Sequence, residues 1–135
     1  MPSQITVGAV VYAKDVARLS RFYAEVAGLA VTHEEQGHVI LETQAFQLVV
    51  VAVPARIAER IQIASPPVRR EDTAVKLCFA VPSLAAARSL VARLGGELNG
   101  SEREWQFQGN RVCDGHDPEG NVLQLRENEA SPVQA

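Results

Sequence analysis

Several side chains that can hold or neutralise charge lie on strand-like segments in the second half of the chain. Lys76 belongs to the segment 74–81, and Gln124 and Arg126 belong to the segment 121–127. Alternate side chains of a strand point to one face, so Gln124 and Arg126 share a face. Two cations beside an amide would suit recognition of a carboxylate, a phosphate or a carbonyl group.

The turn Asp-Pro-Glu-Gly-Asn, which begins at Asp117, sets a carboxylate against these side chains. If Asp117 and Asn121 pair across the turn, Asp114 lies opposite Gln124, and His116 lies on the same face near the rim. Two interpretations stay open. In one, Asp114 completes an internal ion-pair network, because buried charges need partners. In the other, the set lines a pocket that recognises an anion or a carbonyl group.

Two aromatic residues complete the candidate pocket. Tyr12 alternates with Gly8 and Val10 on the first predicted strand and therefore shares their face. Trp105 is the only tryptophan, and it precedes a predicted strand. At the mouth of a pocket it would supply a large apolar face and one N–H donor. Packing on the core or at a dimer contact is the alternative for Trp105.

A second polar group lies in the first half of the chain and consists of His33, Glu34, Glu35, His38 and Glu42. Imidazole and carboxylate groups are metal ligands, and parity puts His38 and Glu42 on one strand face. The same run is also typical of a solvated edge hairpin, which is the interpretation we favour.

The two cysteines, Cys78 and Cys113, have no zinc-binding spacing and lie in apolar, strand-like segments. We expect two reduced, buried thiols in a cytoplasmic protein. Cys113 is a nucleophile by residue type. However, the register of the final hairpin turns it toward the helix side with no base nearby, so we expect a buried thiol there as well.

The elements that position these side chains form two similar halves. In the first, Asp15 is placed to cap a helix that has an apolar stripe and ends at Gly28. In the second, Ser83 is the corresponding cap, and aligning the two caps places Gly96 on Gly28. The predicted strands are 5–13, 30–35, 38–43 and 46–53 in the first half, and 74–81, 97–99, 105–115 and 121–127 in the second. This repeat predicts an α+β fold, with two tandem βαβββ modules that form a curved mixed sheet around a central cup.

We expect one domain, because 135 residues with 47% apolar composition suit a single globular unit. Its predicted parts are module one at 5–53, a connector at 54–73, module two at 74–127 and a frayed tail at 128–135. A short helix should run from Pro54 through Ile61, and the charged run that follows is expected to be solvated.

The charge and hydropathy exclude several classes of partner. A net charge of −3 without a basic stripe gives no attraction to nucleic acid or to anionic lipid. The longest apolar run, 48–54, is too short to cross a membrane, and the first ten residues do not resemble a signal peptide.

Three segments resemble the vicinal-oxygen-chelate superfamily, which includes glyoxalase, bleomycin-resistance proteins, fosfomycin-resistance enzymes and extradiol dioxygenases. They are KDVARLSRFYAEVAGLAV, SLAAARSLVARLGGEL and GHDPEGNVLQLRE. The resemblance spans about residues 5–127 and implies the same two-module fold, with ligands bound in the cup. It does not select one reaction, because one fold hosts many chemistries.

The resemblance also implies a divalent metal held by His and Glu side chains, with two positions from each module. Those positions fall here on Gly8, Val49, Lys76 and Gln124. The first two have no side-chain donor, a lysine ammonium repels a cation, and a glutamine is a weak ligand. We therefore expect no metal at these positions and no other cofactor, and we treat a divalent metal as the less favoured alternative.

These observations predict a protein that binds a small molecule in the cup without the divalent metal of the family, and that forms a homodimer. The expected ligand-binding residues are Lys76, Asp114, Gln124, Arg126, Tyr12, Trp105 and His116. One alternative is a lyase, isomerase or dioxygenase-like enzyme. It would use unusual ligands such as His116 and Asp114, or Lys76 as an electrophile or base. Another is a regulatory module whose own side chains fill the cup.

Overall fold

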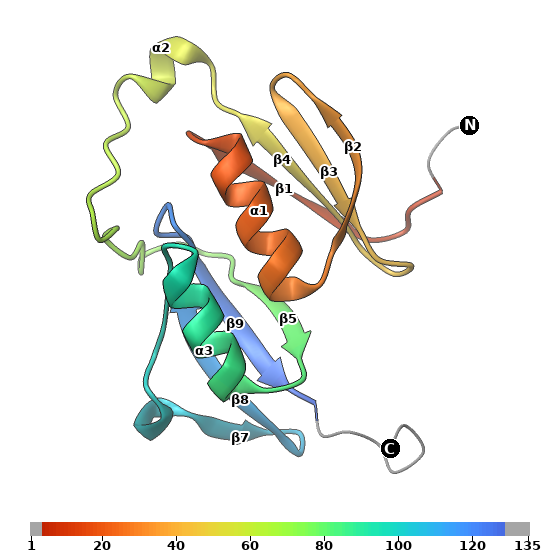
Figure 1. Ribbon diagram of the computed structural model, residues 1–135, viewed down its shortest axis with the longest axis vertical. Coiled ribbons are helices and arrows are strands. Elements are labelled where there is room, and N and C mark those ends of the chain that lie inside the picture. Colours follow the sequence, from red (N-terminus) through yellow and green to blue (C-terminus); the bar gives the residue numbers. More distant parts are fainter. Residues whose placement is uncertain (1–3, 129–135) are drawn as a thin grey trace. The chain divides into compact units, whose positions relative to one another are not determined.

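The chain folds into two compact units, residues 1–62 and 63–135. The computed structural model describes residues 4–128, so the predicted tail at 128–135 lies outside the described residues except for Asn128. Within each unit one longer helix lies against one sheet (Figure 1). The α+β fold with two modules is confirmed. The strands form two hydrogen-bonded sheets, one in each unit, and the predicted central cup stays a prediction.

The described part of the first unit, residues 4–62, contains four strands and two helices. These are β1 (Gly8–Ala13), α1 (Val16–Ala27), β2 (Ala30–Glu35), β3 (His38–Glu42), β4 (Gln47–Ala52) and α2 (Ala55–Ala58). The strand order is β1-β4-β3-β2, with β1 parallel to β4 and the other neighbours antiparallel. This is the order that a strand, a crossover helix and a three-stranded meander produce.

Helix α1 begins and ends where the sequence predicts. The Asp15 carboxylate accepts a hydrogen bond from the Arg18 backbone N–H at 3.1 Å, and Gly28 has a φ of 69°, which favours glycine. The apolar stripe of α1 is buried against β3 and β4. The opposite face of this sheet therefore holds the side chains that alternate with the core residues.

The second unit repeats the pattern with one additional strand. Its elements are β5 (Leu77–Val81), α3 (Leu84–Arg93), β6 (Glu97–Leu98), the 3₁₀ turn η1 (Ser101–Arg103), β7 (Trp105–Phe107), β8 (Asn110–His116) and β9 (Val122–Glu127). The order is β5-β9-β8-β6, and β7 also pairs with β8. Helix α3 contacts β8 and β9, and Val91 of α3, Val112 of β8 and Leu123 and Leu125 of β9 are fully buried.

The strand predicted at 105–115 is instead a hairpin of β7 and β8. Its turn contains Gln108 and Gly109, with φ values of 51° and 81°. Left-handed backbone at both positions produces the tight turn that joins two antiparallel strands. The prediction missed this turn because a Gln-Gly pair is a weaker turn signal than Asn-Gly or Asp-Gly. The connector helix also ends earlier than predicted, at Ala58.

The turn between β8 and β9 sets the register of the polar side chains. One carboxylate oxygen of Asp117 accepts hydrogen bonds from the backbone N–H groups of Glu119 at 2.8 Å and Asn121 at 3.1 Å. Gly120 supplies the left-handed residue, with a φ of 87°. The resulting ladder pairs Asp114 with Gln124, as predicted. Among the described residues, no helix is long and apolar enough to cross a membrane.

Candidate functional site

A row of connected polar side chains crosses the second sheet. The Lys76 ammonium lies 2.8 Å from one carboxylate oxygen of Asp114, and the Gln124 amide donates to the other at 3.2 Å. The Arg126 Nε–H in turn donates to the Gln124 carbonyl oxygen at 3.0 Å. These four residues are called the polar row below. The pairings match the ion-pair network that the sequence allowed, with Gln124 as the bridge.

The polar row lies on the sheet face opposite α3. Leu123 and Leu125 alternate with the row on β9 and are buried on the side where α3 packs. The Lys76 and Asp114 side chains keep 40% and 30% of their surface exposed. An exposed ion pair of this kind contributes about 0–1 kcal/mol to stability. The pairing therefore leaves both charged groups accessible to a ligand.

A cavity of about 350 Å³ adjoins one end of the polar row. Lys76 and Asp114 contribute to its lining, together with Arg69, Arg103 and Asn99. Gln124 and Arg126 do not line it. The lining thus gathers three cationic side chains from distant parts of the second unit, and its carboxylates are Asp114 and Glu71.

Arg69 is a site residue that the sequence did not predict. Its guanidinium donates to His116 Nδ1 at 2.9 Å and to the Asn99 side-chain oxygen at 2.8 Å, and it lies 3.7 Å from a carboxylate oxygen of Glu97. The Arg69 side chain is 16% exposed, so this part of the connector is not solvated as predicted. A charged run does not predict that Arg69 packs against the sheet. The partners of Arg69 lie on β6, directly after β6 and on β8, far along the chain.

His116 shares the face of the polar row by register, but it is buried beneath Arg69 and not open at a rim. It is 5% exposed and accepts the Arg69 hydrogen bond through Nδ1. Burial lowers the pKa of His116, and the positive charge of Arg69 lowers it further. The neutral imidazole of His116 accepts this hydrogen bond and so positions Arg69 at the cavity. Because the lone pair of Nδ1 is used in this bond, it is not free to bind a metal.

Two aromatic residues of β7, Trp105 and Phe107, lie near Arg126 at the other end of the polar row. The Arg126 guanidinium carbon is 5.0 Å from the centre of the Phe107 ring, a cation–π contact. Trp105 shares a strand face with Phe107 and is 40% exposed. Phe107 was not predicted as a site residue, since its face depends on the unpredicted hairpin. Tyr12, on β1 of the first unit, is 66% exposed.

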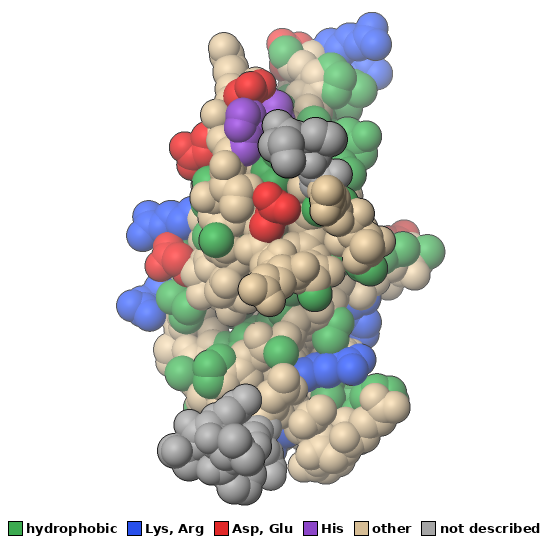
Figure 2. All heavy atoms as spheres, turned by 90° about the vertical axis from the view of Figure 1, so that its right-hand side faces the viewer, with side chains coloured by type: hydrophobic (Ala, Val, Ile, Leu, Met, Phe, Trp, Pro, Cys, Tyr) green, Lys and Arg blue, Asp and Glu red, His purple; other side chains and the backbone are tan. Residues whose placement is uncertain are grey.

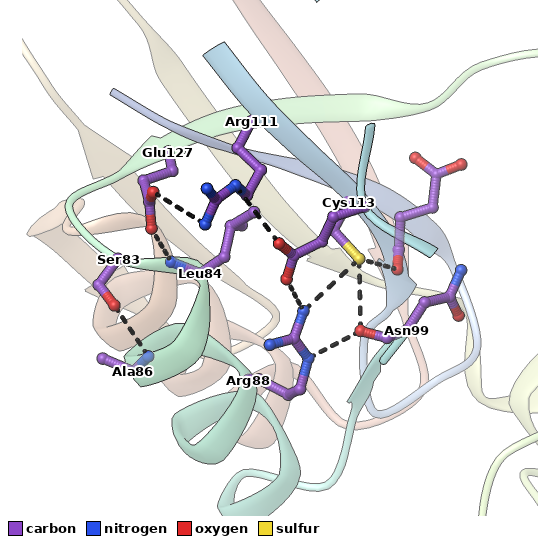
Figure 3. A network of polar contacts seen from close by, with 10 residues as sticks. Ser83, Leu84, Ala86, Arg88, Asn99, Arg111, Cys113 and Glu127 are labelled. Carbon is purple, nitrogen blue, oxygen red and sulfur yellow. Dashed lines mark hydrogen bonds and ion pairs between the residues drawn. The ribbon is translucent and has the colours of Figure 1, made fainter. Parts of the chain in front are cut away.

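The two cysteines differ in exposure. Cys113 is buried on the helix side, as predicted, with its sulfur 3.3 Å from the Asn99 carbonyl oxygen and 3.8 Å from an Arg88 nitrogen (Figure 3). Burial raises the pKa of the Cys113 thiol, which disfavours the nucleophilic thiolate. Cys78, however, is exposed, so the prediction of a buried thiol there was wrong. Strand alternation places it on the face of the polar row, 3.6 Å from the Gln124 carbonyl oxygen.

The four positions that the superfamily uses for a metal do not fit a divalent ion here. A Cβ added at Gly8 would lie 2.8 Å from the Gln47 carbonyl oxygen, because β1 and β4 approach closely. Val49 has no donor, and Lys76 and Gln124 are bonded within the polar row. No carboxylate, imidazole or thiolate stands at any of these positions.

Comparison with known proteins establishes the family. A model of the glyoxalase-like domain matches residues 8–126, so the chain belongs to this family and to the vicinal-oxygen-chelate superfamily. No curated protein matches the sequence significantly.

Solved structures of the same fold span nearly the whole chain. A bleomycin-binding protein complexed with bleomycin is 20% identical, with 92% of this chain and 98% of that chain covered and a TM-score of 0.57. A glyoxalase/bleomycin resistance protein/dioxygenase family enzyme from Burkholderia phytofirmans PsJN is 16% identical, with coverages of 88% and 94% and a TM-score of 0.64. The fosfomycin resistance protein FosX from Mesorhizobium loti is 9% identical, with coverages of 99% and 98% and a TM-score of 0.61. At these identities the likeness establishes the fold alone.

Proposed function

We propose that this chain binds a small molecule carrying an anionic group at the cavity beside Lys76, and that it does so without the divalent metal of its superfamily. One observation carries the proposal. A superfamily metal position holds Lys76, whose ammonium pairs with Asp114 at 2.8 Å and lines a cavity of about 350 Å³. The bleomycin complex of a protein with this fold supports binding of a small molecule.

The chemistry of the lining favours a carboxylate or phosphate as the recognised group. Lys76 and Arg103 offer exposed donors, and the bond to His116 fixes the direction of the Arg69 guanidinium. Hydrogen bonds from charged donors to an anion are about twice as strong as neutral ones. Asp114 would keep Lys76 in place and could accept a hydrogen bond from a ligand hydroxyl group.

The proposal is tested by isothermal titration with a panel of small carboxylates and phosphate monoesters. Lys76→Met should weaken binding of the best ligand about tenfold or more, since a charged hydrogen bond contributes roughly 1.5–3 kcal/mol. Arg93→Met is the matched control, because Arg93 is exposed on α3 and does not line the cavity. Equal losses in both variants would mean that only the overall charge matters, and would contradict the proposal.

The metal-free part of the proposal has its own test. Titration with Mn²⁺, Ni²⁺ and Zn²⁺ should detect no ion whose binding depends on Gln124. Stoichiometric binding that is lost in Gln124→Ala would overturn this part. The enzyme alternative, in which Lys76 is an electrophile or base, stays a prediction, and no contact of Lys76 favours it over binding.

We also propose that the chain forms a homodimer and acts in the cytoplasm. The first sheet has β1 and β2 as its terminal strands, and Val10 and Tyr12 of β1 are 57% and 66% exposed. Terminal strands and exposed apolar side chains are features that association covers. The two cysteines are free, as expected in a reducing compartment.

A further inference from the structure

The β2–β3 hairpin of the first unit brings two histidines and a glutamate together on its surface. His33 Nε2 lies 3.0 Å from one carboxylate oxygen of Glu35, and His38 Nε2 lies 4.0 Å from the other. The imidazole rings are stacked, with centres 5.5 Å apart and planes inclined by 29°. One donor atom from each of the three residues lies within 4.8 Å of the others. Figure 2 shows histidine side chains beside carboxylates on an exposed face.

The backbone fixes this arrangement. The turn that joins β2 to β3 contains Gly37 with a φ of 97°, and Glu35 pairs directly with His38 across it. His33 lies two residues before Glu35 and therefore on the same face. A bulge between Val31 and His33 shifts the register, and such bulges commonly redirect side chains on edge strands. The cluster thus rests on a paired ladder and not on a free loop.

From this geometry we infer a transition-metal site, most suited to Zn²⁺, formed by His33, Glu35 and His38. Zn–N bonds of about 2.0–2.1 Å let one ion join two donors roughly 3.4 Å apart at a tetrahedral angle. The observed distances from His33 Nε2 and His38 Nε2 to the Glu35 carboxylate oxygens, 3.0 and 4.0 Å, lie on either side of that value. Two imidazoles with one carboxylate form a ligand set that zinc uses when one coordination position stays open.

The surroundings of the three ligands suit a metal ion with one open coordination position. The three ligands lie on the wall of a cavity of about 600 Å³ within the first unit. Their side chains are 46%, 59% and 33% exposed, so an ion can enter from solvent. Glu42, which lines the same cavity, accepts a hydrogen bond from the Thr32 hydroxyl at 2.6 Å. Glu42 is therefore already engaged, and water or a small ligand would fill the fourth position.

This site is separate from the four superfamily positions, since none of its residues coincides with Gly8, Val49, Lys76 or Gln124. It also does not depend on the proposed anion site, which lies in the second unit. Either proposal can fail while the other holds.

The test is isothermal titration of metal-free protein with Zn²⁺ alone. We expect one ion per chain. Glu35→Gln, His33→Gln and His38→Gln should each weaken its affinity by at least ~10-fold, the size of loss that removing a supporting residue alone produces at metal sites. Glu34→Gln is the matched control, because it makes the same charge change on the same strand but lies on the other face.

Three outcomes would overturn the inference. They are no saturable Zn²⁺ binding, equal losses in Glu34→Gln and Glu35→Gln, and binding that persists in both histidine variants. Zn²⁺ binding that is lost only in Gln124→Ala would contradict this site and the metal-free proposal together. Anomalous scattering from a Zn²⁺-soaked crystal provides a second measurement, and the ion should lie between His33 and His38.

Discussion

His116 is the residue whose environment has the clearest consequence for pH dependence. Burial and the neighbouring Arg69 lower its pKa below the ordinary value of 6.5, while the carboxylates of Glu97 and Asp117 act in the opposite direction. As pH falls, the unfolded chain therefore binds the proton first. The neutral imidazole contributes stability that is fully present above pH 6.5 and is lost as pH falls toward the lower pKa of the folded state.

This behaviour can be measured by urea unfolding of the protein and of His116→Gln at several pH values. The stability advantage of the unaltered protein should be largest above about pH 6.5 and should shrink below it. A constant difference across this range would show that the His116 imidazole contributes only its hydrogen bond with Arg69, and would contradict the prediction.

At the scale of residues, parity predicted some of the site correctly. It paired Asp114 with Gln124 and turned Cys113 to the helix side. The buried thiol predicted at Cys78 from its apolar neighbours was wrong, because Cys78 is exposed. Arg69 was missed because its partners lie 30 and 47 positions away in the chain, and no local pattern encodes contacts at such separations.

At the scale of elements, two side-chain oxygens accept hydrogen bonds from backbone N–H groups at the start of α3. The Ser83 hydroxyl accepts from the Ala86 backbone N–H at 3.1 Å, and a Glu127 carboxylate oxygen from β9 accepts from the Leu84 N–H at 2.8 Å (Figure 3). The first acceptor is local, and the sequence predicts it. The second joins the helix to a strand 43 residues away, which only the fold brings near.

We expect Ser83→Ala to lower the free energy of unfolding by about 1 kcal/mol, because the Ala86 N–H would lose its acceptor. Ser89→Ala is the control, since Ser89 is exposed within α3. There alanine should be neutral or stabilising by a few tenths of a kcal/mol, because it has the higher helix propensity. Chemical denaturation of both variants measures the difference, and equal effects would argue against the cap.

The main error in the prediction from sequence also lies at the scale of elements. The prediction treats 105–115 as one strand, although the residues Gln-Gly-Asn-Arg at 108–111 interrupt its apolar pattern. The structure divides it at Gln108 and Gly109, where the backbone enters the left-handed region. A Gln-Gly pair is a weaker turn signal than Asn-Gly or Asp-Gly, so the prediction did not place a turn there. The hairpin matters because it places Phe107 against Arg126.

At the scale of the whole molecule, the predicted homodimer can be tested directly. Light scattering coupled to size-exclusion chromatography should give twice the chain mass of 14.6 kDa at micromolar concentrations. Tyr12→Lys should shift the equilibrium toward the monomer if β1 takes part, because it places a charge on an exposed apolar strand. A single species of 14.6 kDa under these conditions would contradict the dimer.

The sequence by itself determined the repeat, the helix caps, the terminal turn and the residue types at the four superfamily metal positions, where no His, Glu, Asp or Cys stands. These features depend on local backbone preference and on residue type, which a linear pattern records. Only the tertiary structure decided that Arg69 reaches His116 and that His33, Glu35 and His38 converge. The physical reason is that such contacts depend on strand register and on segments packed from distant positions, where side-chain geometry selects the partners.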